Sequence, residues 1–411
     1  MTPAVSSIPG ARETKAGSAG GNEIGALVIG GEHPGLGVAR SLGRRGIPVI
    51  VVDDQHSVSS YSRYVKRVVR VPNLLDERAT VDAVLEVGRR YNLRNWVLYP
   101  TRDETVAAFS RYHAELAAFF KVTTPVWDIT KWAWDKKQTY ELAEQLGVPC
   151  PGTFTVGSAA DLPSLYSKLP LAVKPAIKEH FFYATGAKAW RADTPEQLQI
   201  LFSKANKQIP VEEILLQEII PGDGSTQFSY CAFYKEGTAH SVLLACRERQ
   251  HPREFGRAAS YVETVDLPVI EEPSERLLKH INYYGLVELE YKRDPRDGRY
   301  KLLDINARTW GFHSLGAVSG VDFPYLLFAD QMGQSVPRTR AIPRVGWIRW
   351  ITDVPVALSS MLGGYLSPKH YFRSLGRVGC ESIFAKDDPL PSFAEVLLLP
   401  YLIVKKYFSK Q

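Results

Sequence analysis

Two neighbouring apolar segments, residues 286–293 and 300–305, carry polar side chains two residues apart, the last of them directly after the second segment. These side chains are, in chain order, Glu288, Glu290, Asp304 and Asn306. In an extended strand, side chains two residues apart point to the same side. The intervening Asp294-Pro-Arg-Asp-Gly298 favours a turn, so we expect a hairpin that can bring these side chains together. Carboxylate and amide oxygens are ligands that Mg²⁺ prefers, and the hairpin therefore predicts a metal site.

Arg308 lies two residues beyond Asn306 and falls on the same predicted face. Its guanidinium could neutralise a phosphoryl group during transfer. An exposed hairpin with solvated acids is the alternative, and for any one acid alone it is the better explanation. Acids, an amide and an arginine in phase beside apolar neighbours favour a metal site that serves phosphate chemistry.

Further cations occupy positions that suit phosphate or carboxylate binding. Lys174 lies inside the apolar strand predicted for residues 171–175, where an ammonium group must reach water or an anion. Lys136 lies on a predicted helix, where a lysine is usually solvated. Arg247 and Arg249 come at the end of a predicted strand. A planar guanidinium suits a carboxylate or an acyl phosphate, although a surface ion pair is the alternative.

The elements that must position these residues begin with apolar strands alternating with helices. Strands at residues 26–30 and 49–53 flank a glycine-rich turn and a helix, as in the βαβ unit of a parallel sheet. We expect a domain of this kind over about residues 25–125. Thr101–Glu104 follows a strand, at the position where open α/β sheets bind ligands. The turn Gly30–Gly37 lacks the Gly-x-Gly-x-x-Gly spacing, which argues against NAD binding.

The chain from there to about residue 335 alternates short strands with helices. One helix is expected over residues 128–146, because the glycine and proline after it form a normal helix stop. Residues 226–234 and 241–247 alternate apolar and polar side chains, which is typical of antiparallel strands with one buried face. The sequence therefore predicts a mixed α/β and α+β architecture.

The hairpin and the residues after it, Gly285–Gly311, resemble the closing motif of the ATP-grasp superfamily. That motif pairs a strand bearing a glutamate with a strand of the pattern acid-x-Asn-x-Arg. The resemblance implies that Glu290 and Asp304 ligate magnesium and that Asn306 completes a second magnesium site, with Mn²⁺ as a substitute metal. Family members more often have Glu at the position of Asp304, so this chain departs from the common pattern there.

Other segments resemble the nucleotide-binding elements of the family in the same order along the chain. Lys136 and Lys174 match two lysines that contact ATP. Leu216–Gly222 resembles the hinge that binds adenine, with Asp223 as the ribose contact and Gln227 as its alternative. The hinge residues implied to bind the nucleotide are Gln217, Glu218, Ile219 and Ile220. The residues implied to act on the reacting groups are Lys174, Arg247 and Arg308.

The segment that matches the phosphate loop departs from the family. That loop is commonly rich in Gly and Ser, because backbone amides must approach the phosphates. Residues 178–188 have one glycine and three consecutive aromatic residues. We expect a lid that excludes water, with Lys178, His180 or Lys188 supplying charge.

The resemblance implies a Rossmann-like domain, a two-lobed ATP-grasp fold and a C-terminal extension. The expected divisions are a disordered leader at 1–24, the Rossmann-like domain at 25–125, a linker helix and small lobe at 126–215, the large lobe with the metal site at 216–335 and the extension at 336–411. The implied reaction uses ATP to join a small carboxylate, such as an amino acid, to an amine through an acyl phosphate. Amino-acid ligases, including D-aspartate ligase-like proteins, are the most similar subgroup. The alternatives are an ATP-grasp kinase, a carboxylase-type enzyme, or a non-catalytic ATP-binding scaffold at a membrane.

Composition and charge limit the partners. The chain has 50 basic and 44 acidic residues that mostly alternate, so nucleic acid is not an expected partner. Its four cysteines lack the spacing of a zinc site or a disulfide framework, and a cytoplasmic location is expected. A homodimer is left open.

The last segment, residues 393–408, contains an apolar run followed by lysines. The run is too short to span a bilayer. A helix packed on the body of the protein is expected, and a peripheral membrane anchor, with Lys405, Lys406 and Lys410 facing anionic lipid, is the alternative.

Overall fold

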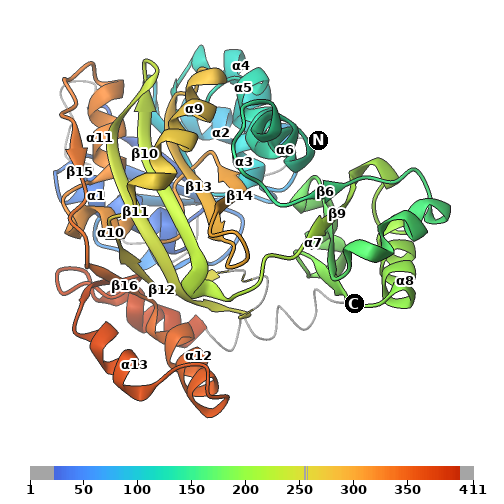
Figure 1. Cartoon of the computed structure of the whole chain (residues 1–411). Helices are drawn as coiled ribbons and strands as arrows, with labels where there is room; N and C mark the ends of the chain where they lie inside the picture. Colours follow the sequence, from blue (N-terminus) through green and yellow to red (C-terminus); the bar gives the residue numbers. More distant parts are fainter. Residues whose placement is uncertain (1–22, 254–255, 257, 399–411) are drawn as a thin grey trace.

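The structure is a computed structural model that describes residues 23–253, 256 and 258–398. Residues 1–22 of the expected leader and residues 399–411 of the C-terminal segment lie outside the described residues. The described part of the chain forms three sheets with helices packed around them (Figure 1). The mixed α/β architecture predicted from the sequence is confirmed.

The first sheet is parallel and has the strand order β3-β2-β1-β4-β5. Its strands are β1 (Ala26–Ile29), β2 (Val49–Asp53), β3 (Arg67–Arg70), β4 (Val97–Pro100) and β5 (Lys121–Val122). Its helices are α1 (His33–Gly43), α2 (Glu77–Arg90), α3 (Asp103–Arg111) and α4 (His113–Ala117). Leu27 and Ile29 pack in a core with residues of α2 and α3, whereas Val28 and Val51 pack in a core that includes residues of the largest sheet. Both faces of this sheet are therefore buried, as parallel sheets require.

The helix expected over residues 128–146 is in fact two helices, α5 (Trp127–Trp134) and α6 (Lys136–Gln145). Asp135 between them has an extended backbone, and its carboxylate accepts a 2.9 Å hydrogen bond from the backbone N–H of Lys137. Aspartate is a favoured N-cap because it satisfies an N–H group that the helix leaves unpaired. The prediction of one helix was wrong because Asp135 caps a second helix inside the helical run.

The small lobe contains a four-stranded antiparallel sheet with the order β6-β9-β7-β8. Its elements are β6 (Thr153–Phe154), β7 (Leu171–Pro175), α7 (Lys178–Thr185), β8 (Trp190–Ala192), α8 (Pro195–Asn206) and β9 (Ile214–Glu218). It has a core of its own, in which Val173, Phe181, Phe202 and Leu216 are fully or almost fully buried. In Figure 1 this green lobe lies beside the large sheet rather than within it.

The large sheet has the order β14-β13-β10-β11-β12-β16-β17, with β15 paired to β11. Its first elements are β10 (Gln227–Lys235), β11 (Thr238–His251), β12 (Ala258–Thr264), α9 (Glu271–His280), β13 (Gly285–Arg293), β14 (Tyr300–Asn306), α10 (Ser314–Val318) and α11 (Phe323–Gln331). The expected hairpin is confirmed as β13 and β14. Phe233 and Leu243 of the large sheet share a core with Val28 and Val51 of the first sheet. Because the two sheets share this core, the division of the chain at residue 125 stays a prediction.

The C-terminal extension continues the large sheet. It adds β15 (Thr339–Arg340), β16 (Gly346–Ile348) and β17 (Val378–Glu381), together with α12 (Trp350–Leu362) and α13 (Pro368–Leu375). Residues 390–398 are also helical. None of the helices in the described ranges is both long and apolar enough to cross a bilayer.

Arg249 of β11 holds this extension in place. Its guanidinium contacts both carboxylate oxygens of Asp353 on α12, at 2.8 and 3.0 Å, and lies over the rings of Tyr261 and Tyr371. The side chains of Arg249 and Asp353 are 5% and 0% exposed. Of the two alternatives given for Arg249, the structure shows the ion pair, although its partner is a buried carboxylate of the extension rather than a surface one.

Candidate functional site

One cavity of about 760 Å³ lies where the three sheets approach one another. Its walls come from the segments after β1 and β4, from β7 and α7 of the small lobe, from the hinge after β9, and from β11, β13 and β14. The structure brings most of the predicted site residues to this cavity, whereas Asp223, His180 and Arg249 do not line it. Those that line it are Lys136, Lys174, Lys188, Gln217, Glu218, Ile219, Ile220, Arg247, Glu290, Asp304, Asn306 and Arg308.

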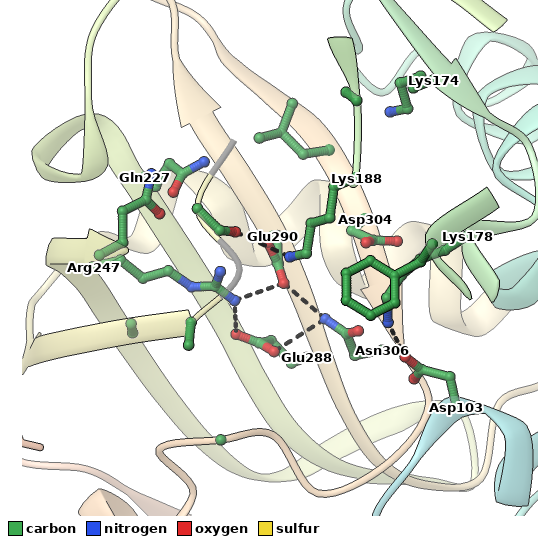
Figure 2. Close-up of a pocket in the computed structure, with 18 of the residues that line it drawn as sticks. Asp103, Lys174, Lys178, Lys188, Gln227, Arg247, Glu288, Glu290, Asp304 and Asn306 are labelled. Carbon is green, nitrogen blue, oxygen red and sulfur yellow. Dashed lines mark hydrogen bonds and ion pairs between the residues drawn. The ribbon is translucent and has the colours of Figure 1, made fainter. Parts of the chain in front are cut away.

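The hairpin places its polar residues directly opposite one another. Glu288 pairs with Asn306 and Glu290 pairs with Asp304 across β13 and β14. The Asn306 amide donates to Glu288 at 3.1 Å and to Glu290 at 2.9 Å. Nη2 of Arg247 lies 2.8 Å from the carboxylate of Glu288 and 2.6 Å from that of Glu290 (Figure 2). The two glutamates are thus held by one amide and one guanidinium.

The two glutamates differ in electrostatic environment. Burial opposes the charge on Glu290, but Arg247 and Lys188 outweigh it and lower its pKa to about 2. Burial raises the pKa of Glu288, and Arg247 only partly offsets this effect. Glu290 is therefore the better anionic ligand of the pair, whereas Glu288 is also fixed by a 2.8 Å hydrogen bond from Ser229.

Lys136 reaches the other acid of the hairpin. It is the first residue of α6, directly after the Asp135 cap, and its ammonium donates to the carboxylate of Asp304. Burial opposes its charge, yet Asp304 raises its pKa above the ordinary value. The capped start of α6 therefore delivers a charged lysine to the hairpin.

Lys174 lies on β7 and has a different environment. Its ammonium donates to the hydroxyl of Tyr140 at 2.8 Å and to the side-chain carbonyl of Gln217 at 2.9 Å, both neutral partners. Burial, together with the charge of Lys136, lowers its pKa to about 7. The strand thus holds a lysine that lacks a charged partner among the described residues.

The residues predicted to bind the nucleotide at the hinge after β9 differ in whether they face the cavity and in whether they already have partners. The carboxylate of Glu218 is engaged by Arg296 at 2.7 Å and lies 3.5 Å from Lys301, so its side chain already has cationic partners. Asp223 does not line the large cavity; its carboxylate accepts hydrogen bonds from the backbone and hydroxyl of Ser225 in its own turn. Gln227, the alternative to Asp223, does line the cavity, and its side-chain oxygen has no partner among the described residues.

The expected lid, residues 178–188, forms helix α7 and the short segment after it. Gly186 ends the helix in the left-handed conformation, at φ +67°, which glycine adopts without strain. Lys178 pairs with Asp103, and Lys188 donates to the backbone carbonyl of Gly256 at 3.0 Å. Burial lowers the pKa of Lys188 to about 8. His180 bonds Glu213 and is not among the residues that line the cavity.

Some residues of the cavity had no specific role in the sequence analysis. Arg349 of the extension donates to Nδ1 of His33 at 2.9 Å and pairs with Glu395 at 2.7 Å. Arg349, His33 and Trp347 line the cavity. The Trp- and Arg-rich composition of the extension is the one sequence signal for these residues. Their contact could not be predicted, because Arg349 and His33 are 316 residues apart.

The described residues contain no group of three or more His, Cys, Asp or Glu side chains that could hold a metal ion. A metal at the hairpin would depend on the two carboxylates of Glu290 and Asp304, the amide oxygen of Asn306 and ligands from a nucleotide. This donor set is all oxygen and fits Mg²⁺.

Comparisons with known proteins support the sequence resemblance. The family model described as ATP-grasp in the biosynthetic pathway with Ter operon matches residues 231–354. D-aspartate ligase from Enterococcus faecium is 24% identical over 324 residues, which are 74% of this chain and 76% of that protein.

Two solved structures show the same fold. L-amino acid ligase from Bacillus licheniformis is 16% identical with a TM-score of 0.60, over 76% of this chain and 75% of that one. The biotin carboxylase domain of 2-oxoglutarate carboxylase from Hydrogenobacter thermophilus, solved with MgADP, is 16% identical with a TM-score of 0.62, over 78% and 73% of the two chains. Residues 231–354 therefore resemble an ATP-grasp family in sequence, and the chain has the same fold as these ligase and carboxylase structures.

Proposed function

We propose that this protein is an ATP-dependent ligase that joins a carboxylate to an amine. The observation that carries the proposal is the convergence, in one cavity, of three hairpin acids and of cations from separate parts of the chain. Among these cations are Lys136, Lys174, Lys188, Arg247 and Arg308. Cations beside carboxylates fit a nucleoside triphosphate with its metal ion, since the cations can bind the phosphates and the carboxylates the metal.

Glu290, Asp304 and Asn306 are the residues that would hold Mg²⁺, with two ions as the fuller proposal and Mn²⁺ as a substitute. The bound metal would neutralise charge on the phosphates. Lys136 and Lys174 would hold phosphate oxygens, because both line the cavity on the small-lobe side of the hairpin. The hinge at residues 217–220 would bind the base, and Gln227 replaces Asp223 as the proposed ribose contact.

The proposed reaction has two steps. The substrate carboxylate attacks the γ-phosphorus of ATP, and ADP leaves with an acyl phosphate formed. The amine then attacks the acyl carbon, the C–O bond to phosphate breaks, and the amide forms as the nitrogen gives up a proton. Arg308 and Arg247 would stabilise the charge on the transferring group. Enclosure of the site by α7 would protect the acyl phosphate from water.

The end of the cavity away from the hinge is the proposed substrate side. It is formed by His33 and Thr101–Glu104 of the first domain and by Phe312, Trp347 and Arg349. Arg349 supplies a guanidinium there for a carboxylate. The name of the D-aspartate ligase relative supports an amino acid as the acid substrate.

A carboxylase-type activity has a similar fold in its favour, but the likeness at 16% identity supports the fold alone. A kinase and a non-catalytic scaffold remain the other rivals. The deciding experiment is ADP release with Mg²⁺ and pools of amino acids and amines. Release that needs both an acid and an amine is the expected result. Release with an acid alone and a stable phosphorylated product would favour a kinase, and ATP binding without turnover would favour a scaffold.

A further inference from the structure

Large apolar side chains are exposed far more often on the C-terminal extension than elsewhere. Of the 19 exposed large apolar side chains among the described residues, 11 lie between residues 350 and 397. We call them the apolar face: Trp350, Val354, Leu358, Leu362, Tyr365, Phe372, Phe384, Leu390, Phe393, Val396 and Leu397. Such a concentration in one part of the chain differs from the scattered single exposure that is normal for a protein.

Helix α12 shows the pattern most clearly. Trp350, Val354, Leu358 and Leu362 recur every four residues and therefore form a stripe along the helix. Leu358 is 53% exposed and Leu362 is 91% exposed. Asp353 and Ala357 are the buried residues of the same helix, and Asp353 is bound by Arg249. One side of α12 is thus held against the large sheet through Arg249, and the other side exposes apolar residues to solvent. In Figure 1, α12 and α13 lie together at one end of the molecule.

The last described helical segment, residues 390–398, has the same two-sided character. Ala394 and Glu395 are buried, and Glu395 binds Arg349 in the cavity wall at 2.7 Å. Phe393 and Leu397 are 65% and 79% exposed. The helical segment that carries Phe393 and Leu397 is therefore joined to the cavity wall by the ion pair between Glu395 and Arg349.

Charge identifies the kind of partner. All five acidic residues between 341 and 398 are engaged. They are Asp353 with Arg249, Glu381 with backbone N–H groups, Asp387 with Arg44, Asp388 with Arg40 and Glu395 with Arg349. Lys369, Arg373 and Lys386 are exposed and have no partner within the described ranges. Residues 405, 406 and 410, beyond those ranges, are also lysines.

We propose that the apolar face docks this protein on an anionic lipid bilayer. Short amphipathic helices with apolar side chains on one side and free cations nearby bind the interface of a bilayer rather than crossing it. Unpaired lysines and arginines add attraction to anionic headgroups. This inference goes beyond the proposed ligase activity and does not depend on it.

The test is cosedimentation of the full chain with phosphatidylcholine vesicles, with and without phosphatidylglycerol. The wild-type protein should bind the anionic vesicles, and added salt should weaken the binding. The double variants Leu358→Glu/Leu362→Glu and Lys369→Glu/Arg373→Glu should each lower partitioning by at least about tenfold. Ile200→Glu is the matched control, because Ile200 is 66% exposed on α8 of the small lobe. It should bind as the wild type does, and circular dichroism melts check that all variants fold.

Three outcomes would overturn the proposal. The first is no binding of the wild type to anionic vesicles. The second is a wild-type dimer in solution that Leu358→Glu dissociates, without vesicle binding, which would make the face a contact between two copies. The third is loss of binding with Leu402→Glu/Ile403→Glu but not with Leu358→Glu/Leu362→Glu, which would confine membrane contact to residues 399–411.

Discussion

Arg308 after β14 is bound by Asp103 at the start of α3, with Nε 2.5 Å and Nη2 3.1 Å from the two carboxylate oxygens. Lys178 of α7 donates to the same carboxylate. Asp103 thus connects α3 with the segment after β14 and with α7, at the arginine that we propose meets the transferring phosphoryl group. Burial opposes its charge, but Arg308 and Lys178 hold its pKa well below the ordinary value.

We expect Asp103→Asn to destabilise the nucleotide-free protein, because it leaves Arg308 and Lys178 without their shared carboxylate. The melting temperature should fall by a few degrees. MgATP should then raise it by more than it does in the wild type, since phosphates would replace the lost anion. Asp128→Asn is the control, because the Asp128 side chain is 87% exposed. A MgATP shift smaller than that of the wild type would contradict this account.

Asp304→Asn should abolish turnover while leaving the fold intact. The amide keeps the size of the side chain but removes a charge that both the metal and Lys136 would use. ADP release should fall by at least about a hundredfold. Asp297→Asn, in the turn of the same hairpin, should retain activity because its carboxylate is 41% exposed and lies 3.6 Å from Lys301. Full activity of Asp304→Asn would show that Asp304 is not a ligand of the metal.

Lys174 predicts proton uptake when ATP binds. Its pKa of about 7 in the nucleotide-free protein means that it is largely neutral one unit higher. Phosphates stabilise the charged form, so binding above this pKa must take up a proton, and ATP affinity should fall as the pH rises. Calorimetry in buffers of different ionisation enthalpy measures this uptake. Lys174→Met should remove most of it, whereas Lys168→Met on the exposed surface of the small lobe should not.

Whereas ATP affinity should fall as pH rises, the contribution of Lys174 to folding stability should increase with pH. A lysine whose folded-state pKa is lowered holds fewer protons in the folded state than in the unfolded state, between its folded and unfolded pKa values. Its contribution therefore makes the folded protein more stable as pH rises from about 7. Urea midpoints of the wild type and Lys174→Met at several pH values should converge as pH rises if burial of this charge is the cause.

Arg349→Gln tests the proposed substrate side of the cavity. It should raise the KM for the acid substrate by about tenfold, the value of one charged hydrogen bond, with little change in the KM for ATP. Glu395→Gln removes the ion pair but keeps the guanidinium. If Arg349 were only a structural tie, both variants would behave alike. The proposal requires Glu395→Gln to leave the KM for the acid near that of the wild type.

Asp353→Asn should be among the more damaging changes outside the cavity. It leaves Arg249 buried without its anion, which costs about 3–5 kcal/mol of unfolding free energy. Urea unfolding measures the loss. Asp82→Asn breaks an exposed pair with Arg78 and should cost no more than about 1 kcal/mol. Equal losses in the two variants would show that the Arg249 pair does not anchor the extension.

The local parts of this molecule could be predicted from the sequence. The hairpin followed from alternation and a favourable turn, and both effects act over a few residues. Lys136 and Lys174 were found through their place in a motif order. The break at Asp135 was also local, and a capping aspartate inside a helical run is a signal that could have been used.

The remaining parts depend on distant pairs that no periodicity encodes. Arg308 meets Asp103 across 205 residues, and Arg349 meets His33 across 316. Arg249 and Arg247 look alike in the sequence, yet one reaches Asp353 of the extension and the other the glutamates of β13. Only the packing of the sheets decides which arginine faces the cavity.

Strand β16 covers an edge of the large sheet that the strands before residue 336 leave open. It pairs with β12 from Tyr261 to Glu263, and β17 pairs with β16 in turn. A chain ending before residue 336 would keep every residue proposed to bind ATP but would leave the backbone of β12 open to another strand. Unprotected edges of this kind promote association between copies. The extension therefore protects this sheet edge, and we expect a chain without it to aggregate even if the proposed nucleotide site stays intact.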